Sequence, residues 1–191
     1  MQLARSDSLI ATQEAEEEDS TLERATAVAL IIDVVKKELL LIRRADDPRD
    51  PWSGHMALPG GRRDPLDVNL MVTACRESLE EVGVQLSPED CFGALPRLKT
   101  YAAKPSMNLS VRPFIFHLEE KKKVIINHEV SEYYWVPLEH FAPERIETFT
   151  KEIGSSLLTF PSWVYQERRI WGLTQRIIQD YMQRCGGQPR S

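Results

Sequence analysis

A glycine- and proline-rich segment that runs directly into an acidic helix is the feature that most constrains this chain. Residues 44–67 contain four prolines and three glycines. Proline removes a backbone donor and glycine admits conformations that other residues avoid, so this segment does not favour one regular element. We expect a loop that is either functional or disordered, and after it a helix over 69–82 that ends at Gly83.

Three glutamates share one face of that helix. At 100° per residue, Glu77, Glu80 and Glu81 lie within about 100° of one another. The opposite, apolar stripe, which suits packing on a sheet, consists of Met71, Cys75, Leu79 and Val82. The glutamates form either a solvated acidic face or the ligands of a hard divalent cation that also bridges to phosphates. The glycine pair before the helix favours the metal site, because it lets the backbone approach an ion or a phosphate closely.

The composition describes one ordinary domain of mid size, for which phosphorylated small molecules remain possible ligands because a metal ion can supply positive charge. With 24 Lys and Arg against 29 Asp and Glu, the formal charge is -5, which argues against nucleic acid as a partner because phosphate-backbone binding needs clustered cations. No run of about 18 apolar residues is present, so we expect no membrane-spanning helix and no membrane partner. The three widely spaced cysteines include no CxxC pair and indicate neither disulfides nor a zinc ribbon, so we expect a cytoplasmic location.

Three parts are expected along the chain: a flexible acidic leader over 1–23, one domain over 24–185 and a polar tail over 186–191. Within the domain, β-branched and apolar runs predict strands over 25–34, 39–42, 98–101, 110–118, 124–126, 133–137 and 157–165. The charged run 119–123 is expected to be a hairpin tip, and the last helix is expected over 170–185.

The segment from Gly61 to Val84 resembles the signature of the Nudix hydrolases, G-x5-E-x7-R-E-U-x-E-E-x-G-U, in which U is aliphatic. The positions that match in identity and order are Gly61, Arg76, Glu77, Glu80, Glu81, Gly83 and Val84. Three features depart from it: Asp67 replaces the first glutamate, eight residues rather than seven separate it from Arg76, and Ser78 replaces an aliphatic residue. The resemblance implies an α/β fold, the Nudix α/β/α sandwich with a mixed β-sheet between helices, and hydrolysis of a diphosphate bond.

The longer spacing also resembles the coenzyme A diphosphatase branch of that family. Residues 59–65 read PGGRRDP and residues 73–77 read TACRE, and both are similar to phrases of that branch, as is IWGLT at 170–174. An upstream pattern of the branch, which begins LLTxR and ends FPGG, is echoed by Leu39, Leu40, Arg43 and Gly54. Within it, Arg44 replaces a small residue and Leu58 replaces phenylalanine, and Arg49 lies five rather than four positions before Gly54.

By this resemblance, Glu77 and Glu81 hold one or more Mg²⁺ or Mn²⁺ ions against a diphosphate, with Glu80 beside them and the carbonyl of Gly60 opposite. The metal would lower the pKa of a bound water, which then attacks phosphorus. Arg76 is implied to act in catalysis by pairing with Asp67 or with a glutamate of the signature, which would fix the loop to the helix.

The remaining site residues divide into a general base and substrate contacts. Glu80 and Glu129 are the two candidates for the base, with a lean towards Glu129. Gly60 and Gly61 would give the substrate a close backbone approach. Arg43 is expected to contact substrate, and Trp52 either stacks on adenine or anchors the loop.

Three functions remain open from the sequence. The first is a diphosphatase of coenzyme A or acyl-CoA, which by the resemblance yields a phosphopantetheine and adenosine 3',5'-bisphosphate. The second is a Nudix diphosphatase of another nucleotide, such as a nucleoside triphosphate, ADP-ribose or a dinucleotide. The third is a catalytically silent binding or scaffold protein. In each case we expect a small-molecule nucleotide diphosphate as the ligand, and a homodimer is the oligomeric state to test.

Overall fold

The structure is a computed structural model that describes residues 25–50, 52–99 and 110–185. The expected leader over 1–23 and the expected tail over 186–191 lie outside the described residues. No helix within the described ranges is long and apolar enough to cross a membrane.

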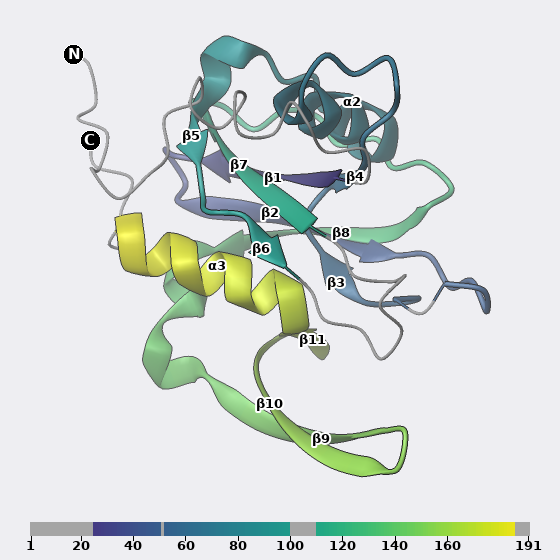
Figure 1. The fold of residues 1–191 in the computed structure, drawn as a ribbon. Coiled ribbons are helices and arrows are strands. Elements are labelled where there is room, and N and C mark those ends of the chain that lie inside the picture. The colour runs from purple at the N-terminus through teal and green to yellow at the C-terminus, as the bar shows by residue number, and fades with distance from the viewer. Residues whose placement is uncertain (1–24, 51, 100–109, 186–191) are drawn as a thin grey trace.

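A mixed sheet forms the centre of the fold (Figure 1). Its central strand, β1 (Ala25–Asp33), pairs in parallel with β7 (Ser110–Leu118) along its whole length. The other edge of β1 is shared by two antiparallel strands: β2 (Glu38–Arg44) pairs with its C-terminal end, and β4 (Gly60–Arg62) pairs with residues 26–28. The glycine-rich loop is therefore attached directly to the central strand.

The remaining strands extend this sheet and form a second one. The main sheet also contains β3 (Met56–Ala57) and β8 (Val130–Pro137) beside β2, and β5 (Cys91–Ala94) and β6 (Leu98–Lys99) beside β7. The second, three-stranded antiparallel sheet consists of β9 (Glu147–Ile153), β10 (Ser156–Tyr165) and β11 (Arg168–Trp171). Short 3-10 turns cover Pro88–Asp90, Leu138–Phe141 and Pro143–Arg145.

Two helices, α2 (Leu70–Val82) and α3 (Gly172–Cys185), cover opposite faces of the main sheet (Figure 1). Side chains alternate along β1, so that Ala29 and Ile31 join the cluster under α2, whereas Leu30 and Ile32 join the cluster that contains Ile178 of α3. This arrangement confirms the expected α/β sandwich with a mixed sheet between helices.

Helix α2 begins and ends close to the expected residues. The side chain of Asn69 accepts the N–H of Val72 at 2.9 Å and caps the N-terminus. Gly83 adopts a left-handed conformation with φ 67°, and its N–H donates to the carbonyl of Leu79. Both ends are thus fixed by the local sequence.

The buried face of α2 differs from the expected apolar stripe. Leu79 is 51% exposed, whereas Ser78 and Glu81 are buried. The Ser78 hydroxyl donates to the carbonyl of Ala74 at 2.7 Å, so its polar group is satisfied inside the helix. The helix is rotated so that Glu81 faces inward, where it meets the glycine-rich loop.

Several expected elements are corrected by the structure. Residues 124–126 are not a strand, and the charged run before them is not a hairpin tip. Instead, the N–H of Ile125 donates to the carbonyl of Val82 and that of Asn127 to the carbonyl of Glu81, so this segment packs along the end of α2. The expected last helix begins at Gly172, because residues 168–171 pair with β10. The irregular 44–67 segment contains the short strands β3 and β4, and β9 was not expected.

Candidate active site

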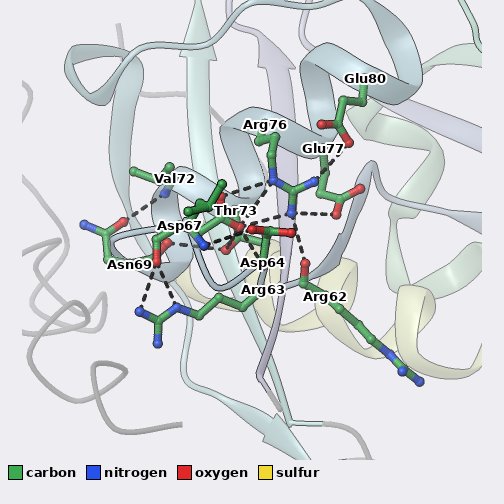
Figure 2. A network of polar contacts seen from close by, with 11 residues as sticks. Arg62, Arg63, Asp64, Asp67, Asn69, Val72, Thr73, Arg76, Glu77 and Glu80 are labelled. Carbon is green, nitrogen blue, oxygen red and sulfur yellow. Dashed lines mark hydrogen bonds and ion pairs between the residues drawn. The ribbon is translucent and has the colours of Figure 1, made fainter. Parts of the chain in front are cut away.

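The guanidinium of Arg76 ties the glycine-rich loop to helix α2 (Figure 2). It lies 3.0 Å from the carboxylate of Asp67 and also donates to the carbonyl of Arg62 at 3.0 Å. Asp67 in turn accepts the hydroxyl of Thr73 and the N–H of Asp64, each at 2.9 Å. Burial opposes ionisation of Asp67, but the hydrogen bonds from Arg76, Asp64 and Thr73 hold its pKa below the ordinary value. The loop and helix are therefore held together by an ion pair and several hydrogen bonds around Asp67 and Arg76.

Glu81 is a buried carboxyl directed at the glycine pair. Its side chain accepts the N–H of Gly60 at 2.9 Å, and the residue is only 2% exposed. Burial raises the pKa of Glu81 to about 7; the charge of Glu77 adds to the rise, and the Gly60 hydrogen bond opposes it. Such a carboxylate carries negative charge that its protein surroundings do not fully compensate.

Glu77 lies one turn earlier, against the second glycine of the pair. A Cβ added to Gly61 would overlap the Glu77 carboxylate, so glycine is what allows this side chain to lie in its present position. Burial raises the pKa of Glu77, and the charges of Glu80 and Glu129 add to the effect, while Arg76 at 2.9 Å opposes it. Glu77 and Glu81 are thus two carboxyls whose charged forms are disfavoured side by side.

The two candidate bases differ in what holds them. The carboxylate of Glu80 is half exposed and pairs with Arg76 at 2.9 Å. Glu129 lies on the turn before β8, where its carbonyl accepts the N–H of Ala45 at 2.8 Å and its N–H donates to the side chain of Asn127. The charge of Glu129 is close enough to act on both Glu77 and Glu81. The structure therefore brings this distant residue to the acidic end of α2.

The donor chemistry of this cluster fits a hard divalent cation. Within the described ranges, no three His, Cys, Asp or Glu side chains are gathered into a ready-made metal site. The carboxylates are nevertheless oxygen donors of the type that Mg²⁺ and Mn²⁺ prefer. The raised pKa values of Glu77 and Glu81 show negative charge that a cation would stabilise.

Arg43 and Trp52 are placed less directly at the site. Arg43 donates to Asp46 at 3.0 Å and to Ser131 at 2.9 Å, and lies 3.6 Å from Glu132, so its guanidinium is engaged beside the Glu129 turn. Trp52 is 39% exposed in the loop before β3, with its N–H bonded to the side chain of Asp50.

Three features of the site escaped sequence reasoning. The hydroxyl of Thr73 donates to Asp67, and the carbonyl of Arg62 accepts a hydrogen bond from Arg76. The threonine is part of the TACRE phrase, which was its available signal, whereas a backbone acceptor cannot be recognised from the sequence. Arg44 pairs with Asp50 at 2.8 Å, and its charge partly offsets the raised pKa of Glu81. Its position next to Arg43 was the available signal.

Comparison with known proteins agrees with this geometry. A NUDIX domain family model matches residues 23–157. NudL of Yersinia pestis (strain Pestoides F), an uncharacterized Nudix hydrolase, is 33% identical over 170 residues, which cover 86% of this chain and 80% of that protein. NudL of Yersinia enterocolitica is 32% identical over 165 residues, with 80% and 77% covered.

Solved structures show the same fold. A MutT protein from Methanosarcina mazei Go1 is 30% identical with a TM-score of 0.51, and the match covers 63% of this chain and 83% of that one. A MutT/nudix family protein from Enterococcus faecalis has a TM-score of 0.58 at 17% identity, with 85% and 62% covered, which speaks for the fold alone. Hydrolases of this family generally use divalent metal ions. The chain therefore belongs to the Nudix family and is a hydrolase that acts on the pyrophosphate bond of a nucleotide-linked substrate.

Proposed function

We propose that this Nudix hydrolase cleaves the diphosphate of coenzyme A or of an acyl-CoA, with a phosphopantetheine and adenosine 3',5'-bisphosphate as products. The observation that carries the diphosphatase reaction is the pair of the buried Glu81 and the partly buried Glu77 against Gly60 and Gly61. The choice of coenzyme A is supported by the PGGRRDP loop and by the eight-residue spacing from Asp67 to Arg76, whose side chains form an ion pair at 3.0 Å.

Glu77 and Glu81, with Glu80 and the carbonyl of Gly60, would hold Mg²⁺ or Mn²⁺. When bound, the metal supplies positive charge to the phosphate oxygens and lowers the pKa of a water molecule. The absent side chain of Gly60 leaves room for Ala27 and Val28 of β1, and that of Gly61 leaves room for the Glu77 carboxylate, so the glycine pair lets the loop pack closely against the strand and the helix. Arg76 is proposed to act by holding the loop that carries these glycines, since its guanidinium bonds the loop on two sides.

Glu129 is the proposed general base. It must take a proton from the attacking water, so its carboxylate needs freedom to reach that water. Glu80 is bound to Arg76 at 2.9 Å, whereas Glu129 is exposed on a turn whose backbone is anchored to Ala45. The water would then attack one phosphorus and the bond from that phosphorus to the bridging oxygen would break.

Arg43 and Trp52 have different proposed roles on the substrate side. The contacts of Arg43 with Ser131 and Glu132 support a positioning role for the Glu129 turn beside any direct phosphate contact. Trp52 presents a partly exposed ring in the loop that leads to Gly60, which supports stacking on adenine.

The wider biological setting also belongs to the proposal. The three cysteines, all within the part of the chain that the structure describes, form no disulfide, which is compatible with the proposed cytoplasmic compartment. The ligand is proposed to be a small nucleotide diphosphate, with neither nucleic acid nor membrane as a partner. A flexible acidic leader, one catalytic domain and a short polar tail are the proposed organisation.

A substrate panel tests this function. Purified protein is assayed with Mg²⁺ or Mn²⁺ on coenzyme A, acyl-CoA, ADP-ribose, dinucleoside polyphosphates and nucleoside triphosphates. Glu81→Gln should abolish turnover, and Glu144→Gln, which alters an exposed acid on the 3-10 turn Pro143–Arg145, is the matched control. Preference for coenzyme A and loss of activity in Glu81→Gln alone would support both parts of the proposal.

Two other outcomes would redirect it. Preference for another nucleotide would support the hydrolase activity and overturn the coenzyme A assignment. The departures from the branch pattern at Arg44 and Leu58 would then be the first positions to examine for the difference in specificity. Absence of turnover on every compound, with clear thermal stabilisation by nucleotides, would favour a silent binding protein.

A further inference from the structure

The hairpin of β9 and β10 carries an apolar surface that the proposed reaction does not use. Figure 1 shows this hairpin extending away from the main sheet and from α3. Phe149 lies opposite Phe160, and Lys151 lies opposite Leu158, so these side chains share one face of the pair. On the other side of β10, Trp171 lies opposite Ser162 and therefore joins the same face.

We name this surface the hairpin face. Its members are alternate residues of the three strands, from Glu147 to Ile153 on β9, from Ser156 to Val164 on β10, and Arg169 and Trp171 on β11. The opposite face of β10 differs at its root, where Trp163 is buried in the core against Phe141. At its root, the opposite side of the second sheet therefore packs on the domain core, whereas the hairpin face does not take part in this packing.

The root of the hairpin face is an aromatic cluster edged with cations. The ring of Trp171 lies 5.2 Å from that of Phe149 and 5.3 Å from that of Phe160. The ammonium of Lys151 lies 4.7 Å from the centre of the Trp171 ring, and the guanidinium of Arg169 lies 4.6 Å from that of Phe149. Apolar surface and positive charge thus occur together.

This root contacts His55 in the loop that precedes β3. The ring of His55 lies 5.0 Å from that of Trp171, and the carbonyl of His55 accepts the N–H of Arg44 at 3.0 Å. Arg44 is close enough to Glu81 for its charge to act on that carboxyl. The aromatic cluster is therefore linked through His55 to Arg44, whose charge acts on Glu81.

The outer part of the hairpin face is apolar and accessible. Leu158 and Ile153 are each 44% exposed. From Ser162 to Ser156 the strand advances by six residues, which corresponds to about 20 Å. The face therefore forms a strip that starts at Trp171, beside His55, and runs to the hairpin tip.

We propose that the hairpin face binds the acyl chain of an acyl-CoA substrate. The inference rests on the proposed function and adds to it the place where the chain lies. A flexible apolar chain would cover Phe160, Leu158 and Ile153, whose exposed surface it would remove from water. Lys151 and Arg169 would border the polar, anionic part of the substrate nearest the diphosphate.

Adjacent leucines on β10 provide a matched test. Leu158 lies on the hairpin face, whereas Leu157 lies on the opposite side and is 74% exposed. For the wild type, kcat/KM on decanoyl-CoA should exceed that on coenzyme A by about tenfold or more, because each buried methylene group contributes. Leu158→Ser should remove most of this ratio without changing kcat/KM on coenzyme A, and Leu157→Ser should leave both unchanged. Equal effects of the two variants, or no acyl preference in the wild type, would overturn the inference.

A binding measurement separates this inference from the proposed reaction. Titration calorimetry with metal-free protein compares decanoyl-CoA with coenzyme A, so turnover is not needed. If no CoA compound is hydrolysed, the proposed function fails, yet tighter binding of decanoyl-CoA that Leu158→Ser abolishes would still support the hairpin face as an acyl site. Equal affinities would overturn it. So would sedimentation that finds a wild-type dimer and a Leu158→Ser monomer, because a second copy would then cover the face.

Discussion

The buried carboxylate of Glu81 accepts the backbone N–H of Gly60 at 2.9 Å, although the two residues are 21 positions apart. This bond joins the end of the acidic helix to the start of the signature loop. The carboxyl is nearly without solvent, and this burial raises its pKa to about 7 although the Gly60 hydrogen bond lowers it. The contact with Gly60 thus holds the carboxyl in place, whereas burial accounts for its raised pKa.

The stability of metal-free protein should depend on Glu81 between pH 5 and 8. The folded state binds this proton more tightly than the unfolded chain, whose glutamates titrate near 4.5. Its stabilising effect is therefore complete below about pH 4.5 and is lost as the pH rises through about 7. Relative to Glu81→Gln, the wild type should lose on the order of 2–3 kcal/mol of unfolding free energy over this range. Urea unfolding at several pH values in chelator measures both slopes, and parallel slopes would contradict the expectation.

Removal of Arg76 should lower the free energy of unfolding as well as the activity. Arg76→Ala leaves Asp67, which is 4% exposed, without its cation. We expect a loss of about 2–4 kcal/mol, less than for a fully buried pair because Arg76 is partly exposed. Asp67→Ala in the same background should cost little more. Denaturant unfolding of the four proteins gives the coupling energy, and additive losses would show that the pair does not act as a unit.

Gly61→Ala should impair activity more than stability. The added methyl group would displace the Glu77 carboxylate, a side chain that can rotate away, and Gly61 has no left-handed backbone to strain. Turnover should fall by about tenfold or more, because a shift of about 1 Å would take the Glu77 carboxylate out of the position proposed for metal binding. The midpoint of unfolding should change little. In a Glu77→Ala background the same substitution should have no further effect on kcat. A further drop there would place the conflict elsewhere.

Glu129→Gln should lower kcat more than Glu80→Gln. The loss of a general base typically costs about 100-fold or more, and Glu80 is held by Arg76. The pH–rate profile on the preferred substrate distinguishes the two, because removal of the base should eliminate its acidic limb. If Glu80→Gln shows the larger loss and the altered limb, the roles are reversed.

The regular elements with strong patterns were predicted well from the sequence. β1, β2 and β7 have continuous β-branched and apolar residues because they are buried, and Gly83 marks the end of α2 through its left-handed conformation. β9 was missed because residues 147–153 carry polar or charged side chains at most positions, and pairing with β10 rather than burial forms the strand. The short strands β3 and β4 likewise depend on distant partners.

The candidate site was predicted in composition but not in detail. The resemblance identified Glu77, Glu80, Glu81 and Arg76, and the ion pair of Arg76 with Asp67 is present in the structure. The helical wheel placed Leu79 inside, which is wrong, and it did not predict that Glu81 is buried, where the Gly60 N–H stabilises it. Periodicity alone cannot account for a hydrogen bond from another segment. The catalytic, metal-binding and substrate-binding roles stay predictions.

The pairing of β4 with β1 should make opening of the glycine-rich loop slow. β4 pairs with residues 26–28 of the strand, and the N–H of Ala29 donates to the carbonyl of Pro59 at 2.8 Å. Release of this loop therefore breaks hydrogen bonds of the central sheet, which belongs to the slowest-exchanging part of a domain. Amide protons around Gly60 should exchange on the timescale of global unfolding. We therefore expect the glycine-rich loop to be formed before a substrate binds, rather than to form on binding.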